Sequence, residues 1–251
     1  MLLVFLLPLF QAAGQLPDAG QILNKSRDLS LTGSMSANIN LTITEKGGGT
    51  RNRTISMTTK SYQDGLEKRF IKFIEPADVR GTAMLVVDNK NANDEMWIYL
   101  PALKKTRRIV TSEKGRSFMS SEFTNADMSS PALSDFTNRH SEKSGTNNQW
   151  IIESVPVNDD KADEYGYPKK VSYISMDKYQ VLKMEFYNFD NELFKTIEIK
   201  SIYPLTDGKY LVKDMIAYNL VTNRKSQILF SNIKDGVSVD DSFFSLQNLE
   251  R

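Results

Sequence analysis

Residues 35–44 read MSANINLTIT, and every second side chain in this stretch is apolar. Because successive side chains of a β-strand point to opposite faces of a sheet, this alternation predicts a strand with one buried face. Three glycines at positions 47–49 favour a turn after it. Beyond that turn, Arg53, Ile55 and Met57 share one face of a predicted return strand. The sequence therefore predicts a β-hairpin here.

The same strand signal recurs along most of the chain. Almost no helical segment separates the predicted strands, which is typical of an antiparallel sheet. One short amphipathic helix is predicted over residues 18–29, and the acidic residues 156–168 are predicted to be an exposed loop. The further predicted strands are residues 66–74, 81–88, 95–100, 106–110, 149–155, 169–176, 181–189, 195–203, 210–221 and 226–233.

The composition is that of an ordinary globular protein. The 251 residues are 40% hydrophobic and 25% charged, which is enough for a sizeable core in a single domain. The formal net charge is +1 at pH 7, so the chain as a whole is not attracted to nucleic acid, and we expect no nucleic-acid partner. No cysteine is present, so the chain forms no disulfide.

The first residues have the pattern of an export signal. Residues 1–10, MLLVFLLPLF, are apolar but too few to span a bilayer as a helix, and small residues follow at positions 12–14. We therefore expect residues 1–14 to be a signal peptide, cleaved near Ala13 or Gly14, and residues 15–251 to be the exported domain. The alternative is a buried strand at the N-terminus.

Two predicted strands are apolar on both faces. Residues 83–87 read AMLVV and residues 96–100 read MWIYL, so neither face of these strands suits contact with water. A second layer must cover the second face. This layer is either another sheet or a helix that lies over a curved sheet and encloses a pocket.

A candidate for the covering layer begins at Ser130. Its hydroxyl precedes Pro131 at the first helical position, a pattern typical of a helix start. Helices this short need packing to hold them, and the alternative is an ordinary surface connection. The apolar residues near this start are Phe118, Met119, Phe123, Met128, Ala132, Leu133 and Phe136.

No catalytic or metal-binding pattern stands out. His140 is the single histidine and has no second candidate ligand nearby, whereas a zinc or copper site needs several nitrogen or sulfur donors. A Ser-His-Asp triad built on His140 is arithmetically possible, but the Gly-x-Ser-x-Gly turn of many hydrolases is missing. The paired carboxylates at positions 159–160 and 240–241 lie in polar, turn-like stretches. We therefore expect no metal, no cofactor and no enzymatic activity.

A cluster of cations follows residues 96–100. Between residues 100 and 116 there are six lysines or arginines and one acidic residue, in a chain whose net charge is only +1. One interpretation is a solvated hairpin end, where cations discourage the pairing of sheet edges. The other is a docking patch for anionic lipid or an acidic partner. We call the central four residues the basic tip; they are Lys104, Lys105, Arg107 and Arg108.

Residues 73–82, FIEPADVRGT, resemble a segment of the outer membrane lipoprotein-sorting protein family, which belongs to the LolA/LolB-like superfamily. The family usually has glycine at the positions of Arg116 and Ser120. The resemblance continues in residues 97–104 (WIYLPALK), 107–109 (RRI), 117–124 (SFMSSEFT) and 241–250 (DSFFSLQNLE).

The resemblance implies a mainly β domain. Its single, strongly curved antiparallel sheet would form an incomplete barrel, with an N-terminal helix and a short helical lid over an apolar cavity. It also implies a monomeric periplasmic carrier that shelters acyl chains of lipoproteins or lipids and moves them between membranes. An accessory subunit of a lipid exporter and, less favoured, a lipid hydrolase are the alternatives. The expected cavity-lining residues are Met84, Val86, Trp97, Tyr99, Phe118, Met119, Phe123, Leu133 and Phe136.

Such a carrier needs a donor and an acceptor for its cargo. The resemblance implies an inner-membrane transporter or an outer-membrane acceptor as a transient partner. The basic tip would contact that partner, or an anionic membrane surface, while the carrier is docked.

Overall fold

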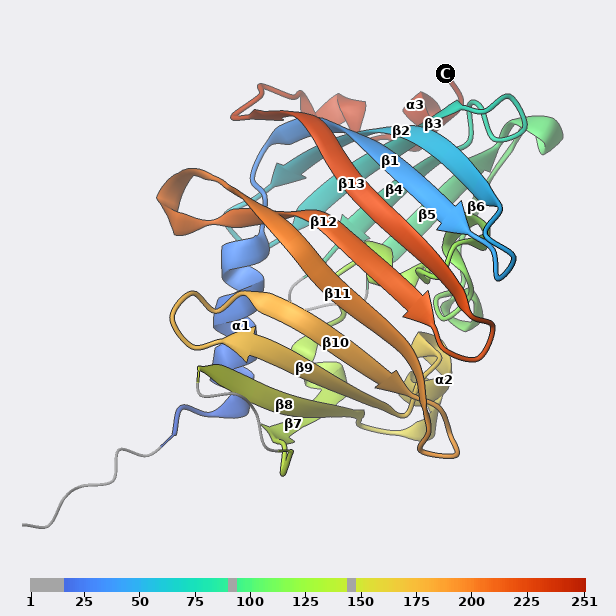
Figure 1. Ribbon diagram of the computed structural model, residues 1–251. Helices are drawn as coiled ribbons and strands as arrows, with labels where there is room; N and C mark the ends of the chain where they lie inside the picture. Colours follow the sequence, from blue (N-terminus) through green and yellow to red (C-terminus); the bar gives the residue numbers. More distant parts are fainter. Residues whose placement is uncertain (1–15, 90–93, 144–147) are drawn as a thin grey trace, which may run out of the picture.

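Thirteen antiparallel strands form one curved sheet in this computed structural model, which describes residues 16–89, 94–143 and 148–251 (Figure 1). The order across the sheet is β6-β5-β4-β3-β2-β1-β13-β12-β11-β10-β9-β8-β7, and the end strands β6 and β7 do not pair with each other. The sheet is therefore an incomplete barrel, as predicted. The predicted signal peptide, residues 1–14, lies outside the described residues.

Most elements coincide with the alternating or helical stretches of the sequence, although no strand is predicted over β7. The strands are β1 Met35–Thr44, β2 Thr50–Ser61, β3 Glu67–Glu75, β4 Ala83–Asp88, β5 Glu95–Leu100, β6 Lys105–Arg108, β7 Phe136–His140, β8 Gln149–Pro156, β9 Lys169–Ser175, β10 Val181–Tyr187, β11 Leu193–Pro204, β12 Tyr210–Asn219 and β13 Arg224–Asp235. The helices are α1 Ala19–Ser30, α2 Asp159–Tyr165 and α3 Leu246–Leu249.

The inner face of the curved sheet carries the main hydrophobic core. In β1 the alternating apolar residues are buried on this face, and β1 pairs with β2 on one side and with β13 on the other. Leu41, for example, lies opposite Arg53 of β2 and Ile228 of β13. The pairing of β1 with β13 thus joins the first and second halves of the sheet.

Helix α1 packs against β7–β9 and β12 on the inner side of the second half. Asp18 caps its N-terminus, because the carboxylate accepts a hydrogen bond from the backbone N–H of Gln21. Ile22 is buried in a cluster with Trp150 of β8. The predicted N-terminal helix is therefore confirmed.

Strands β4 and β5 send apolar side chains to both faces of the sheet. Met84 and Val86 belong to the inner core, whereas Trp97 and Tyr99 pack on the outer face. Residues that pair across neighbouring strands point to the same face of the sheet, and successive residues point to opposite faces. Trp97 pairs with Leu85, which lies between Met84 and Val86, so Trp97 points away from the inner core. The prediction that all four line one cavity is therefore wrong for Trp97 and Tyr99.

The C-terminal segment, residues 237–251, covers the outer face of these strands. Phe244 and Leu249 join the outer apolar cluster. The ammonium of Lys60 on β2 holds the segment in place, since it donates to Asp241 at 2.6 Å and also to a backbone carbonyl. The second layer required by the apolar outer face is thus the end of the chain.

Residues 109–135 fill the hollow of the sheet, on its inner side (Figure 1). This segment, which we call the plug, consists of short 3-10 turns and extended stretches. Phe118 and Phe123 are fully buried in the main core, and the Phe118 ring lies 5.9 Å from that of Phe73. The plug is therefore packed into the core.

The helix predicted to start at Ser130 and Pro131 is not formed. Leu133–Asp135 make one 3-10 turn, and the chain then enters β7, where Phe136 lies opposite Pro156 of β8. In β7 the backbone N–H and C=O groups form hydrogen bonds with β8. A short isolated helix would be only marginally stable.

The plug contains a left-handed turn without glycine. Met119 and Ser120 have φ angles of 50° and 64°. Ser120 stands at one of the positions where the resembling family usually has glycine. A left-handed backbone costs a non-glycine residue roughly 1 kcal/mol, so burial of the flanking phenylalanines must offset this strain.

The acidic residues 156–168 are not simply an exposed loop, because they contain α2. Asn158 caps the helix by accepting a hydrogen bond from a backbone N–H, and Gly166 ends it with φ 78°. Glu164 is buried and pairs with Lys114 of the plug at 2.6 Å. The acidic composition suggested solvent exposure, but this ion pair holds α2 against the plug.

Candidate functional site

A cavity of about 230 Å³ lies between the inner face of the sheet and the plug. Its walls come from β1–β3, from β12 and β13, from Ser30 and Thr32 at the end of α1, and from Phe118 and residues 127–130 of the plug. The alternation that buries one face of β1 and β2 supplies much of the apolar wall. The apolar lining includes Ile39, Ile55, Met57, Ile71, Phe118 and Phe230.

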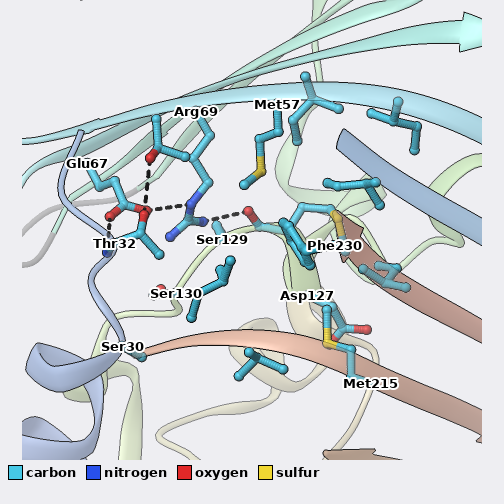
Figure 2. A pocket seen from close by; sticks show the side chains of 18 of the residues that line it. Ser30, Thr32, Met57, Glu67, Arg69, Asp127, Ser129, Ser130, Met215 and Phe230 are labelled. Atoms are coloured by element: carbon cyan, nitrogen blue, oxygen red, sulfur yellow. Dashed lines mark hydrogen bonds and ion pairs between the residues drawn. The ribbon is translucent and has the colours of Figure 1, made fainter. Parts of the chain in front are cut away.

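One end of this cavity is polar. Figure 2 shows Glu67 and Arg69 on one side and Met57 and Phe230 on the other. The serines at the polar end are half-buried whereas much of the apolar wall is buried, so the polar end is nearer to solvent. The polar lining residues are Ser30, Thr32, Thr59, Glu67, Arg69, Asp127, Ser129 and Ser130.

A network of buried charges, which we call the Arg69 network, borders the polar end. The Arg69 guanidinium donates to Glu67 at 2.6 Å and to Asp88 at 3.0 Å, and Arg27 of α1 pairs with Asp88 at 2.9 Å. Arg69 also donates to the backbone carbonyl of Met128 at 2.7 Å. The network therefore connects α1, β3, β4 and the plug.

A second ion pair lies at the plug. The carboxylate of Asp127 is 2.9 Å from the ammonium of Lys195 on β11, and the side chain of Lys195 is buried over the Phe186 ring. Asp127 also accepts a hydrogen bond from the backbone N–H of Thr124. Both charges of this pair are thus satisfied within the protein.

Two other groups near the plug and on the inner face have shifted pKa values. Burial raises the pKa of Asp94 to about 6, and the negative charge of Asp88 adds to the rise. Burial lowers the pKa of Lys170 on β9 to about 8. Both shifts favour the uncharged form, so the surroundings of each group disfavour an unpaired charge.

Phe118 is the one residue among the nine expected lining residues that contributes to this cavity. The cavity lies beside β1–β3 rather than over β4 and β5, where we expected it, because the plug's phenylalanines fill the space there. Of the others, Met84, Val86, Phe123 and Phe136 are buried in the main core, Met119 packs against it, Leu133 is half-buried, and Trp97 and Tyr99 lie on the outer face.

The sequence reasoning missed Glu67 and Arg69. The sequence does contain an indication of their burial, because strand periodicity places both residues on the face that carries Ile71 and Phe73. Two charges in line with two buried apolar residues indicate a buried ion pair. The sequence does not show which groups in other parts of the chain contact this pair.

The basic tip lies at the β5–β6 hairpin and along β6, which is an edge strand. Arg107 pairs with Glu113 at 2.6 Å and Arg108 with Glu95 at 3.3 Å. Lys104 and Lys105 are exposed and have no ion-pair partner among the described residues, and the neighbouring Leu103 is 68% exposed. Two of the four cations are thus available to an outside partner.

The described parts of the chain contain neither a cluster of metal ligands nor a helix that could span a bilayer. No group of three or more histidine, cysteine, aspartate or glutamate side chains there could hold a metal ion. The imidazole of His140 lies 2.8 Å from the backbone carbonyl of Pro17. None of the described helices has the length and hydrophobicity to span a bilayer.

Comparison with known proteins identifies solved structures that have a similar fold. No curated protein sequence matches this chain significantly. An outer membrane lipoprotein-sorting protein domain from Vibrio parahaemolyticus is 24% identical, with a TM-score of 0.83 over 93% of this chain and 98% of that chain. A DUF1329 family protein from Desulfovibrio piger is 25% identical, with a TM-score of 0.81 over 92% and 97%. A LolA superfamily protein from Nitrosomonas europaea is 17% identical, with a TM-score of 0.71 over 92% and 99%.

These structures confirm, at the level of the fold, the resemblance carried by residues 73–82. A family model described as "Uncharacterized protein" matches residues 65–251, which is more than half of the chain. The chain therefore belongs to the family of that model, and its fold is that of the lipoprotein-sorting and LolA superfamily domains.

Proposed function

We propose that this protein is a periplasmic carrier that takes up an acyl chain of a lipoprotein or lipid in the cavity and releases it at another membrane. The observation that carries this proposal is an apolar hollow of about 230 Å³ with the plug as one wall. The similarity of the fold to a lipoprotein-sorting domain supports it. Residues 1–14 would export the chain, and no chemical step on the cargo is needed.

The volume of the cavity suits part of one acyl chain. A cavity of about 150 Å³ accepts a six-carbon ring, so 230 Å³ corresponds to on the order of nine chain carbons. At about 0.8 kcal/mol for each buried CH₂, such a chain gains roughly 7 kcal/mol before ordering costs. Binding of this strength is reversible, as a carrier requires.

Release would require the plug to shift. Its residues 127–130 are half-buried at the cavity and are held by a few polar contacts. Arg69 holds the Met128 carbonyl at 2.7 Å, and the backbone N–H of Ser130 donates to Asp88 at 2.9 Å. Docking on a transporter or an acceptor would have to break these contacts.

Filling the cavity is expected to abolish cargo binding. Met57→Trp adds bulk to the cavity wall, whereas Met84→Trp adds the same bulk to the inner core outside the cavity. Both changes overpack the core and should lower the unfolding free energy by about 1–3 kcal/mol. Mass spectrometry of organic extracts should find stoichiometric acyl lipid with the wild type and Met84→Trp, and less than a tenth of it with Met57→Trp.

Equal lipid content in the two variants would contradict the assignment of this cavity. A wild-type protein that carries no lipid would contradict the carrier itself. A lipid-free protein that copurifies with a membrane transporter would instead identify an accessory subunit of an exporter.

We also propose that the basic tip docks on an anionic membrane. Each cation near such a surface contributes about 1 kcal/mol, so Lys104→Gln with Lys105→Gln should weaken association roughly 30-fold. Flotation with phosphatidylglycerol vesicles measures this, and wild-type association should fall with salt. Lys178→Gln with Lys225→Gln, the same charge change at exposed positions elsewhere, is the control. If both double variants float like the wild type at every salt concentration, the tip is a solvated hairpin end.

A further inference from the structure

The polar end of the cavity offers hydroxyl groups to a ligand. The Thr32 hydroxyl lies 3.1 Å from that of Thr59, and the Ser129 hydroxyl donates to the Ala126 carbonyl at 3.3 Å. The Ser130 hydroxyl has no hydrogen bond to any other part of the described chain. The Thr59 hydroxyl donates to the Gly33 carbonyl, so Thr32 is the donor to Thr59. Ser130 therefore keeps its proton for an ester or amide carbonyl, whereas the other three hydroxyls can only accept, for example from an alcohol or an amide N–H.

The charged groups at the cavity are already paired. Arg69 directs its three nitrogens at Glu67, Asp88 and the Met128 carbonyl. Glu67 in turn accepts from Arg69, from the backbone N–H of Thr32 and from a serine hydroxyl. Asp127, the remaining charge in the lining, is paired with Lys195. No cation is left in the cavity wall to meet an anionic ligand.

The charges of the Arg69 network also cancel. Arg27 and Arg69 oppose Glu67 and Asp88, and the two carboxylate side chains are each only 1% exposed. A carboxylate or phosphate at the polar end would approach Glu67 and Asp127, both negative, and would lose its water without gaining a cation. Transfer of an unpaired charge from water is far more costly than transfer of a hydrogen-bonded neutral group.

We propose that the cavity selects cargo with a single apolar chain whose first polar group is uncharged, such as an acylglycerol or an acyl amide. Free fatty acids and lipids with an anionic group close to the chain are selected against. The limit of one chain follows from the volume, which lies below the usual range of about 300–1,000 Å³ for ligand pockets. The inference rests on the proposed carrier function and names the chemistry of its cargo.

Calorimetric titration of the delipidated full-length mature protein tests the selection with three ten-carbon ligands. At pH 8, 1-monodecanoylglycerol should bind at least tenfold more tightly than decanoate, which has the same chain and an ionised head. Didecanoylglycerol should bind no more tightly than the monoacyl compound, because its second chain finds no space.

Two serine variants test where the head group of the ligand lies. Ser130→Ala removes the unpartnered hydroxyl at the polar end and should weaken binding of 1-monodecanoylglycerol roughly two- to tenfold. Ser134→Ala, an exposed position on the same segment and outside the cavity, should leave it unchanged. Neither variant should alter the weak binding of decanoate.

The outcomes separate this inference from the carrier proposal. If decanoate binds as tightly as 1-monodecanoylglycerol, the selection for a neutral head is wrong while the carrier proposal stands. Tighter binding of didecanoylglycerol would refute the single-chain limit. An unchanged affinity in Ser130→Ala would refute the placement of the head group. Failure of all three ligands to bind, together with lipid-free wild-type protein, would overturn the carrier proposal itself.

Discussion

Replacing Arg69 by methionine is expected to lower the free energy of unfolding by about 3–5 kcal/mol. The variant leaves Glu67 buried without its cation and leaves Asp88 with Arg27 alone. It also removes the hydrogen bond that holds the Met128 carbonyl of the plug. Because the variant removes one charged partner from a buried network, the carboxylate of Glu67 stays desolvated and its charge is uncompensated. Urea unfolding followed by circular dichroism measures the effect.

The matched control removes an exposed arginine from an ion pair between neighbouring strands. Arg139 is 72% exposed and lies 2.6 Å from Glu153 on the next strand. Arg139→Met should therefore cost less than about 1 kcal/mol. Adding Glu67→Gln to Arg69→Met should recover part of the loss, because it removes the unpaired charge. Similar stabilities of Arg69→Met and Arg139→Met would show that the Arg69 network contributes little to the fold.

Truncating Phe123 to alanine should have an effect of similar size, about 3–5 kcal/mol. Its side chain is 0% exposed and lies in the main core, so the change creates a cavity there. Leu133→Ala, a half-buried position nearer the end of the plug, should cost only about 1 kcal/mol. Thermal and urea unfolding of both variants make the comparison.

This pair of variants decides whether residues 109–135 are part of the core or a separable lid. A helical lid would contribute little to global stability, so its truncation would impair cargo binding and leave unfolding unchanged. The buried phenylalanines predict the opposite for Phe123. Wild-type stability in Phe123→Ala would mean that the plug opens without unfolding the sheet.

The strands were predictable because their signal is local. Alternation within residues 35–44 reports which side chains are buried, and nearly every predicted strand is present. The exceptions arise where local signals compete. The Ser130 and Pro131 pattern suggests a helix, yet Phe136 enters β7, since pairing with β8 satisfies its backbone. Residues 156–168 look solvent-exposed, yet they contain α2 with its buried Glu164.

The candidate site was less predictable for a different reason. The sequence shows that residues 83–87 and 96–100 are apolar on both faces, but it does not distinguish the two faces. The C-terminal segment covers Trp97 and Tyr99 on one face, and the plug covers the other. Both covering segments are distant in sequence or irregular in structure, so periodicity carries no information about them.

The sequence by itself determined that this chain forms an antiparallel sheet with a continuous buried face, because successive side chains of a strand point in opposite directions wherever the strand lies. Only the tertiary structure decided where on that face a cavity remains. The cavity exists because β1 pairs with β13, which sets Ile39 opposite Phe230, and because Arg69 on β3 holds the Met128 carbonyl of the plug beside it. Such contacts join residues far apart in the chain, so their geometry depends on the complete fold.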